Sequence, residues 1–366
     1  MTKRAADIAN IRSLCALGLP GEQLIPAILE ALREIIPSAC NLFDWTDARG
    51  NLVRYYFEGP INPQVARHYF EEFHNRREQE AMPAFREVVE RSVVRSATEL
   101  DHPAFFRSAL YHEIWKPQGL HYRVEAVVHD SRRRPLGSLV LYRAPGDLIF
   151  SKSEEALLGS LVPYIAGALE RGNSLPQDFT PRRGRRALLS LSSEGELQHL
   201  SHDAHKMLLL AHGGITPDAA GQAPRRQAYP TLERLVAQVR HRGASSRGNA
   251  SLTVENAWGR FRFDAEPLAP LDPAAPATIH VTIDHDEPRA VAERRALGTL
   301  PLSVVQKEVC ALLHAGCAQA QIAAALSVAP STVADHVRKI YLKLDVHSVH
   351  ELRQMLNAAG ANEAAG

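Results

Sequence analysis

The sequence lacks any apolar run that approaches the ~18 residues needed to cross a bilayer, and its polar start, MTKRAADIAN, has no apolar signal-peptide core. Cysteine is also scarce. Four residues, Cys15, Cys40, Cys310 and Cys317, in a chain of 366 do not make a disulfide framework. We therefore expect a protein of the reducing cytoplasm that has no membrane partner.

An excess of charge is missing as well. Lys and Arg number 42 against 41 Asp and Glu, so any nucleic-acid binding must come from a local patch. The chain has no P-loop, no nucleotide-binding glycine fingerprint and no kinase signature. The cluster SHDAHK cannot form a catalytic triad, whose members converge from separate elements. We predict that the protein is not an enzyme and has no catalytic residues and no cofactor.

One spacing is compatible with metal binding. Cys310, His314 and Cys317 follow the pattern C-x3-H-x2-C, but no fourth ligand is evident. We therefore predict no metal site.

The length predicts two or three domains, and composition shifts suggest their boundaries. In chain order we expect a first domain over 1–172, a linker over 173–186, a second domain over 187–285, a connector helix over 286–298, a helical domain over 299–357 and a disordered tail over 358–366. The linker holds four basic residues that we predict to be solvated, with contact to DNA or an acidic partner as the alternative: Arg182, Arg183, Arg185 and Arg186.

The first domain has the pattern of an α+β fold. An amphipathic helix over 21–36 precedes hairpin patterns at 40–59 and 122–143, a helical stretch over 62–80 lies between them, and a capped helix ends before Gly172. This order, with the ending VLYRAPGDLIFSKSEEALLGSLVPYIAGAL, resembles a GAF domain. The resemblance implies a small-molecule sensor and dimerisation fold.

The second domain opens with two short strands around Glu194 and Gly195. Helices over 202–212 and 231–241 follow, separated by loop-like residues 213–230, and antiparallel strands end the domain. This order resembles a PAS domain.

The third domain fits four short helices. Ser303 and Gln306 form a capping box for the first, and Pro330 starts the third, where its missing N–H costs nothing. The second and third helices are joined by the turn SVA, as in a helix-turn-helix. The apolar residues expected to form their shared core are Ile322, Leu326, Val333, Val337 and Ile340. The opposite side of the third helix carries Ser331, Asp335, Arg338 and Leu342.

Residues 302–352 resemble, without gaps, the LuxR-type helix-turn-helix. The resemblance is carried by Leu302, Ser303, Glu308, Val309, Gly316, Ile322, Ala323, Leu326, Thr332, Val333, His336, Val337, Ile340, Lys343, Leu344, Val346, His347 and Ser348. It implies a fold of four helices that binds double-stranded DNA as a dimer and regulates transcription.

Several residues depart from the family pattern. Ser327 and Asp345 stand where glycine is usual, and Ala329 stands where a capping Ser is common, a loss of ~1 kcal/mol of helix stability. Residues 302–352 hold four basic and four acidic side chains, so one copy should bind DNA weakly and dimerisation is needed. The alternative is a helical protein-interaction domain.

The family's docking pose places three side chains at base edges, namely Ala334, Asp335 and Arg338. Arg338 would pair with guanine, Asp335 would accept from cytosine, and Ala334 would touch a thymine methyl. The residues expected to contact phosphates and set the register are Ser331, Thr332, Lys339, Lys343, His347 and Ser348.

Aromatic residues concentrate in the first domain, where we expect an apolar ligand pocket beneath YHEIWKPQGLHY. The candidate ligand-binding residues are Trp45, Tyr111, Trp115 and His121. An ordinary core of sheet and helices is the alternative for each of them.

Together these patterns predict a multidomain α+β protein: GAF-like and PAS-like antiparallel sheets followed by an all-α LuxR-type domain. We expect a DNA-binding transcription regulator that forms a homodimer and responds to a small-molecule effector, with RNA polymerase as a further candidate partner. The alternative is an interaction protein that does not bind DNA and pairs with a related regulator.

Overall fold

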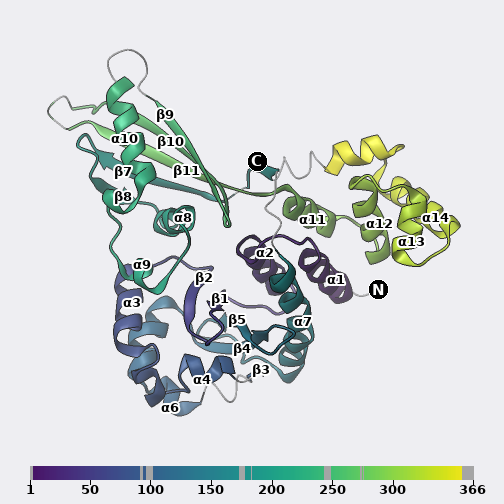
Figure 1. Ribbon diagram of the computed structural model, residues 1–366, viewed down its shortest axis with the longest axis horizontal. Coiled ribbons are helices and arrows are strands. Elements are labelled where there is room, and N and C mark those ends of the chain that lie inside the picture. Colours follow the sequence, from purple (N-terminus) through teal and green to yellow (C-terminus); the bar gives the residue numbers. More distant parts are fainter. Residues whose placement is uncertain are drawn as a thin grey trace.

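The computed structural model describes residues 3–90, 94–95, 102–172, 178–182, 184–242, 249–272, 274 and 276–356. Two antiparallel sheets are followed by a set of helices that stands apart from both of them (Figure 1). This arrangement confirms the predicted fold class. No helix in the described part of the chain is both long enough and apolar enough to cross a bilayer.

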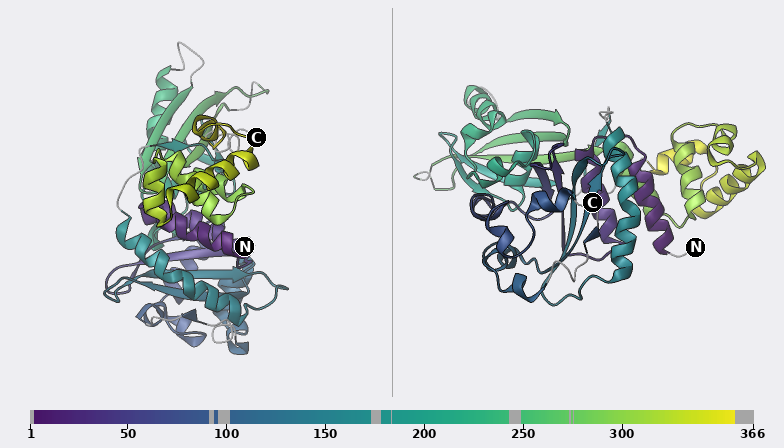
Figure 2. Two further views of the ribbon diagram at one scale, coloured as in Figure 1. Left: turned by 90° about the vertical axis from the view of Figure 1, so that its right-hand side faces the viewer. Right: turned by 60° about the horizontal axis from the view of Figure 1, so that its bottom comes forward.

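The first sheet has the strand order β2-β1-β5-β4-β3. Its strands are β1 (Cys40–Thr46), β2 (Leu52–Phe57), β3 (Val94–Arg95), β4 (Tyr122–His129) and β5 (Pro135–Arg143). The helices on one side of it are α1 (Lys3–Cys15), α2 (Gly21–Arg33) and α7 (Lys152–Arg171), and α1 lies beside α7 (Figure 2). The predicted cap of α7 is confirmed, because Ser151 and Glu154 form a capping box. Helix α1 was not anticipated, since its apolar residues have almost no helical periodicity.

Short segments cover the other face of this sheet. They are α3 (Pro63–His68), the π-helical turn η1 (Tyr69–Phe73), η2 (Arg77–Glu80), α4 (Phe85–Glu90), α6 (Pro103–Phe106), η3 (Tyr111–Trp115) and η4 (Lys116–Gln118). The helical stretch predicted over 62–80 is present as α3, η1 and η2, but it is interrupted at residues 74–76. Asn75 has a left-handed φ of 54°, and the buried Glu78 carboxylate accepts the backbone N–H groups of Asn75 and Phe85, which holds the chain in a turn.

The second sheet repeats the order of the first. Its strands are β7 (Arg186–Ser192), β8 (Leu197–Leu200), β9 (Ala250–Asn256), β10 (Gly259–Leu268) and β11 (Thr278–Pro288), ordered β8-β7-β11-β10-β9. In both sheets the fifth strand thus lies between the first and the fourth. The helices that follow β8 are α8 (Ala204–Ala211), α9 (Pro217–Gly221), the turn η5 (Arg226–Ala228) and α10 (Pro230–Arg242). Residues 213–230, expected to be a loop, include α9, which Thr216 caps.

The segment read as a solvated linker is partly structured. Strand β6 (Phe179–Thr180) pairs with the end of β11, and Arg182 donates to both carboxylate oxygens of Glu30 at 2.6 and 2.7 Å. Only 15% of the Arg182 side chain is exposed. The prediction of solvated arginines is thus wrong for Arg182, because sequence patterns do not reveal the acidic partner on α2. Residues 173–177 and 183 lie outside the described residues.

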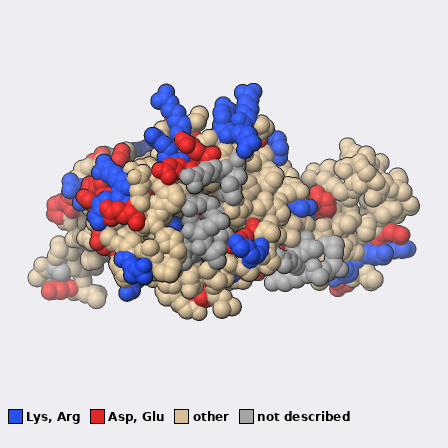
Figure 3. All heavy atoms as spheres, turned by 90° about the horizontal axis from the view of Figure 1, so that it is seen from below, with Lys and Arg blue, Asp and Glu red and all other residues tan. Residues whose placement is uncertain are grey.

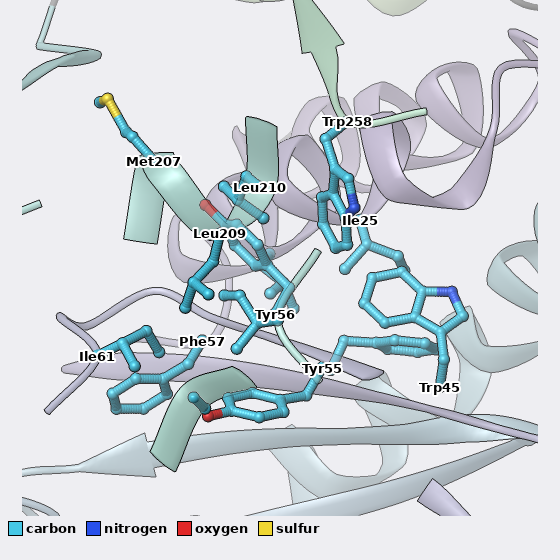
Figure 4. Close-up of a cluster of buried hydrophobic side chains, with 14 of the residues drawn as sticks. Ile25, Trp45, Tyr55, Tyr56, Phe57, Ile61, Met207, Leu209, Leu210 and Trp258 are labelled. Carbon is cyan, nitrogen blue, oxygen red and sulfur yellow. The ribbon is translucent and has the colours of Figure 1, made fainter. Parts of the chain in front are cut away.

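The two sheets share one hydrophobic core, which runs from α1 to the start of α11 (Arg289–Thr299). At the contact between them, Trp258 lies 5.5 Å from Trp45, nearly perpendicular to it, and stacks at 6.0 Å on Tyr56 (Figure 4). Backbone pairing continues the contact, since the Tyr55 N–H donates to the Ile215 carbonyl at 2.9 Å. We call this contact the domain seam.

The C-terminal domain follows α11 and has a separate core. Its helices are α12 (Val304–His314), α13 (Gln319–Leu326), α14 (Pro330–Leu344) and a last helix over 349–356. Ile322, Val333, Val337 and Ile340 are buried together, and Leu326 packs half-buried against them, as expected. The capping box of Ser303 and Gln306 is present. The three residues 327–329 link α13 to α14, so the predicted helix-turn-helix is confirmed.

Two turns of this domain adopt left-handed backbone conformations without glycine. Ser327, after α13, has φ 53° and ψ 43°, and Asp345, after α14, has φ 53° and ψ 47°. Glycine adopts this conformation at no steric cost, whereas a residue with Cβ loses about 1 kcal/mol, somewhat less for Asp.

We predict that Ser327→Gly stabilises the C-terminal domain by about 1 kcal/mol, because the strain of the left-handed turn is removed. The measurement is urea unfolding of the full chain, followed by the helical circular dichroism signal. Ala324→Gly, at an exposed position one turn earlier in α13, is the control and should destabilise the domain by about 1 kcal/mol. Equal destabilisation by both changes would contradict the role assigned to Ser327.

Candidate functional site

The outward face of α14 is the candidate DNA-contacting surface. Val333, Val337 and Ile340 point inward, while all three predicted base-contact residues, Ala334, Asp335 and Arg338, are exposed. The side chains of Arg338 and Asp335 are 79% and 58% exposed and form an ion pair of 2.8 Å along the helix. Leu342, one turn further, is 83% exposed and completes a ridge that the domain does not cover.

The predicted phosphate contacts fall into two groups. Ser331 and Thr332 in the first turn of α14 are exposed, and so are Lys339 and His347. Lys343 and Ser348, in contrast, already have internal partners. Lys343 donates to the Gln306 side chain at 3.0 Å, and the Ser348 hydroxyl accepts the Glu351 backbone N–H at 3.1 Å, which caps the last helix. These two residues thus also stabilise the domain.

Basic and acidic side chains balance over residues 302–352, the segment that includes this ridge. Lys307, Arg338, Lys339 and Lys343 are matched by Glu308, Asp335, Asp345 and Glu351. Most of the domain's surface seen from below is uncharged, and the basic atoms visible there have acidic atoms beside them (Figure 3, right). One copy therefore presents little net attraction for a phosphate backbone.

The fold of the C-terminal domain and its exposed ridge on α14 are those of a helix-turn-helix domain of the DNA-binding class. Residues 300–356 match the family model described as "Bacterial regulatory proteins, luxR family", and the C-terminal domain is a LuxR-family helix-turn-helix domain. The match covers the C-terminal part of the chain only.

Several solved structures are similar to longer parts of the chain. A ligand and DNA complex of VqmA from Vibrio cholerae is 16% identical over 50% of this chain and 86% of that one, with a TM-score of 0.23. A VqmA dimer without target DNA is 17% identical over 50% and 86%, with a TM-score of 0.20. The DhaR(N)–DhaL complex of E. coli is 13% identical over 78% and 90%, with a TM-score of 0.23. These scores do not establish a common arrangement of domains. No curated protein matches the chain.

A second candidate site is a cavity of about 140 Å³ between the first sheet and the short segments that cover it. Of the four predicted ligand residues, Trp115 lines this cavity and the other three do not. Tyr111 and His121 are hydrogen-bonded to each other at 2.6 Å, and Trp45 lies in the domain seam. Besides Trp115, the aromatic side chains in the cavity wall are Tyr55, Phe57, Tyr69, Phe70, Phe85 and Tyr142.

The sheet also brings charged side chains into the cavity wall. Asp44 on β1, opposite Tyr55 on β2, lines it together with Arg123 and Glu125 on β4. The Arg123 guanidinium lies 4.3 Å from the Trp115 ring centroid and 4.9 Å from that of Phe105. Glu125 accepts a hydrogen bond of 2.5 Å from Ser138. These residues alternate with apolar ones that face the other side of the sheet.

Burial changes the protonation of this group. Burial, reinforced by the nearby Glu125 and Glu78 carboxylates, raises the pKa of Asp44 well above its usual range. Burial also lowers the pKa of His74, another lining residue, to about 4, so its imidazole is neutral. Sequence reasoning missed Asp44, Arg123 and Glu125, although charged residues at inward strand positions in NLFDWT and YRVEAVV were a usable signal.

The Cys310–His314–Cys317 pattern has a structural explanation. Cys310 is fully buried in the core of the C-terminal domain, and burial raises the pKa of its thiol to about 12. His314 lies 3.4 Å from Glu293. Among the residues described, no group of three or more potential metal ligands comes together.

We predict that Asp44→Asn stabilises the protein more at pH 8 than at pH 5. A carboxyl group whose pKa is raised by folding contributes stability that is present below its unfolded pKa, about 4, and is lost as the pH rises through the folded pKa. Asn does not titrate, so the variant escapes this loss. The measurement is the difference in Tm between variant and wild type at several pH values.

The control is Asp47→Asn in the same hairpin. Hydrogen bonds from Asn51 hold the pKa of half-buried Asp47 below its usual value, so its stabilising effect is complete above about pH 4. The Tm difference of this control should therefore stay constant between pH 5 and pH 8. A constant difference for Asp44→Asn as well would show that Asp44 ionises normally.

Proposed function

We propose that the protein is a cytoplasmic, sequence-specific transcription regulator that binds double-stranded DNA through α14. The observation that carries the proposal is the exposed ridge of Asp335, Arg338 and Leu342 on a helix whose other face is buried within a luxR-family match. A helix presented in this way fits the major groove, which is about 12 Å wide.

Each base contact has a specific chemistry. In this proposal Arg338 would donate two hydrogen bonds to a guanine, and Asp335 would accept one from a cytosine. Their ion pair is highly exposed, so solvent screening makes it weak, and exchanging it for base contacts costs little. Ala334 beside them would meet a thymine methyl group, while Ser331, Thr332 and Lys339 would hold phosphates.

The regulator is proposed to act as a homodimer on a two-part site. The even charge count of residues 302–352 gives one copy little electrostatic affinity, and two linked copies would add their binding energies. RNA polymerase is the natural further partner if the regulator activates transcription.

The first domain is proposed to sense a small-molecule effector, and its contacts with α11 would transmit the signal. Glu30 on α2 binds Arg182, and Arg295 of α11 lies 3.6 Å from Glu30 and 2.5 Å from Glu287. Arg294 of the same helix lies 3.7 Å from Glu308 on α12. A shift of α2 would therefore reach the helix-turn-helix through charged contacts.

One observation favours a second candidate function. Asp335 places a negative charge on the ridge and neutralises Arg338, which disfavours phosphate contact. In this alternative the protein does not bind DNA itself but pairs with a related regulator and blocks it. Binding to DNA fragments at several salt concentrations separates the two.

We predict that Arg338→Ala lowers affinity for the preferred site by about 10- to 100-fold and relaxes its sequence selectivity, because a bidentate guanine contact is lost. The measurement is a gel shift with DNA selected by the wild-type protein. Lys339→Ala is the matched control one position along. It should weaken binding to all sequences alike and reduce the salt dependence by about one phosphate contact. Unchanged selectivity in Arg338→Ala would overturn the base-contact assignment.

A further inference from the structure

The Asp44 carboxyl group has no hydrogen-bond or ion-pair partner among the described residues, although it is 92% buried and lines the cavity. The other acids nearby are satisfied. Glu125 accepts from Ser138, and Glu78 accepts from two backbone N–H groups and from the Tyr69 hydroxyl. A buried acceptor without a donor is costly, and such groups in native structures indicate a missing partner.

The charges around Asp44 indicate what that partner is. The lining residues include two carboxyl groups, Asp44 and Glu125, against one guanidinium, Arg123, while the burial of His74 keeps its imidazole neutral. Arg123 is held by stacking on Trp115 and Phe105. Burial favours the protonated form of the Asp44 carboxyl group, and a positively charged ligand would favour its ionised form and balance that charge. An anionic ligand would instead meet the negative charge of Glu125 and gain nothing from Asp44.

The rest of the wall suits an apolar body. Tyr55, Phe57, Phe70 and Tyr142 line the space around Asp44, and aromatic rings attract organic cations as well as apolar groups. Only Asp44 then needs to supply the directional hydrogen bond.

We infer that the cavity binds a small organic cation, a protonated amine on an apolar or aromatic body, whose N–H group donates to Asp44. This inference names the class of effector within the proposed function and rests on it. Successive residues of β1 and β2 face opposite sides of the sheet, which connects the cavity to the domain seam. Asp44 and Tyr55 line the cavity, while their neighbours Trp45 and Tyr56 contact Trp258 on the other side.

The test compares matched probes on the full chain. Titration calorimetry measures 2-phenylethylamine, its neutral analogue 2-phenylethanol and its anionic analogue phenylacetate, with butylamine and cyclohexylamine as amines of other shape. We expect at least one amine to bind about 10-fold or more tightly than the alcohol, with no binding of the anion. This comparison needs no variant and cannot be confused with a folding defect.

Asp44→Asn should abolish the preference for the amine over the alcohol, and Asp47→Asn, at a residue that does not line the cavity, should leave it unchanged. Equal or tighter binding of the alcohol by the wild type would mean that Asp44 acts as a neutral donor, which overturns the inference. So would an undiminished preference in Asp44→Asn, or no amine binding up to about 10 mM.

The DNA-binding proposal can be tested independently of the cavity proposal. Arg338→Ala should bind the amine as the wild type does, and Asp44→Asn without ligand should bind DNA as the wild type does. Amine binding without any DNA binding would therefore leave the cavity assignment intact and overturn the regulator proposal alone.

Discussion

The packing of Trp258 at the domain seam is the contact on which the arrangement of the two sheets depends. Trp258 is 97% buried and packs against Trp45 and Tyr56, and such aromatic pairs add about 0.5–1.5 kcal/mol to the gain from burial. The indole N–H donates to the Gly213 carbonyl. Gly214 must be glycine, because its φ is 115° and a Cβ would lie 2.6 Å from the indole nitrogen. Further hydrogen bonds join the two domains: Lys206 donates to the carbonyl of Glu58, and Arg67 donates to that of Gly221. With a continuous core and these contacts, the two sheets form one unit rather than two freely moving domains.

That unit limits how an effector can act. A ligand beside Asp44 meets β1 and β2, the strands whose opposite faces carry the seam, so it cannot shift them without disturbing Trp258. The same core includes α2, where Glu30 holds Arg182 and approaches Arg295 on α11. A chain of packed and paired side chains thus leads from the cavity to the helix before the DNA-binding domain. Such a chain transmits a signal only if α11 has two stable positions, which makes its ion pairs, rather than the rigid core, the element to be switched.

The sequence predicted the C-terminal domain best, because its local signals agree with its packing. The structure contains the predicted apolar stripe of Val333, Val337 and Ile340, the capping box at Ser303 and the proline at the start of α14. The cavity was placed only approximately. Trp115 was found, but Tyr111 and His121 pair with each other, and Trp45 faces the seam, since strand register decides which side a residue faces. The break at Asn75 and the burial of Arg182 depend on Glu78 and Glu30, and contacts of this kind leave no periodic pattern.

The two sheets have the same strand order, so the cavity face of the first can be compared with the face of the second on which α8 packs. The side chains on these two faces differ in kind. In the second sheet, that face carries Leu189, Leu191, Phe261, Phe263, Val281 and Ile283, all of them buried. Helix α8 packs on these strands, and all of its leucines are buried. Among the titratable residues near this face, His285 stacks on Phe261 at 4.2 Å, and burial lowers its pKa to about 3, so it stays uncharged. Burial also lowers the pKa of His205 on α8 and of His212, which contacts Phe263. The first sheet carries Asp44, Arg123 and Glu125 at equivalent depth, at a cost in desolvation that a purely structural sheet would not need. The polar cavity wall of the first domain therefore suits the proposed recognition of a ligand, whereas the second sheet has an apolar inner face and its domain carries Trp258 to the seam.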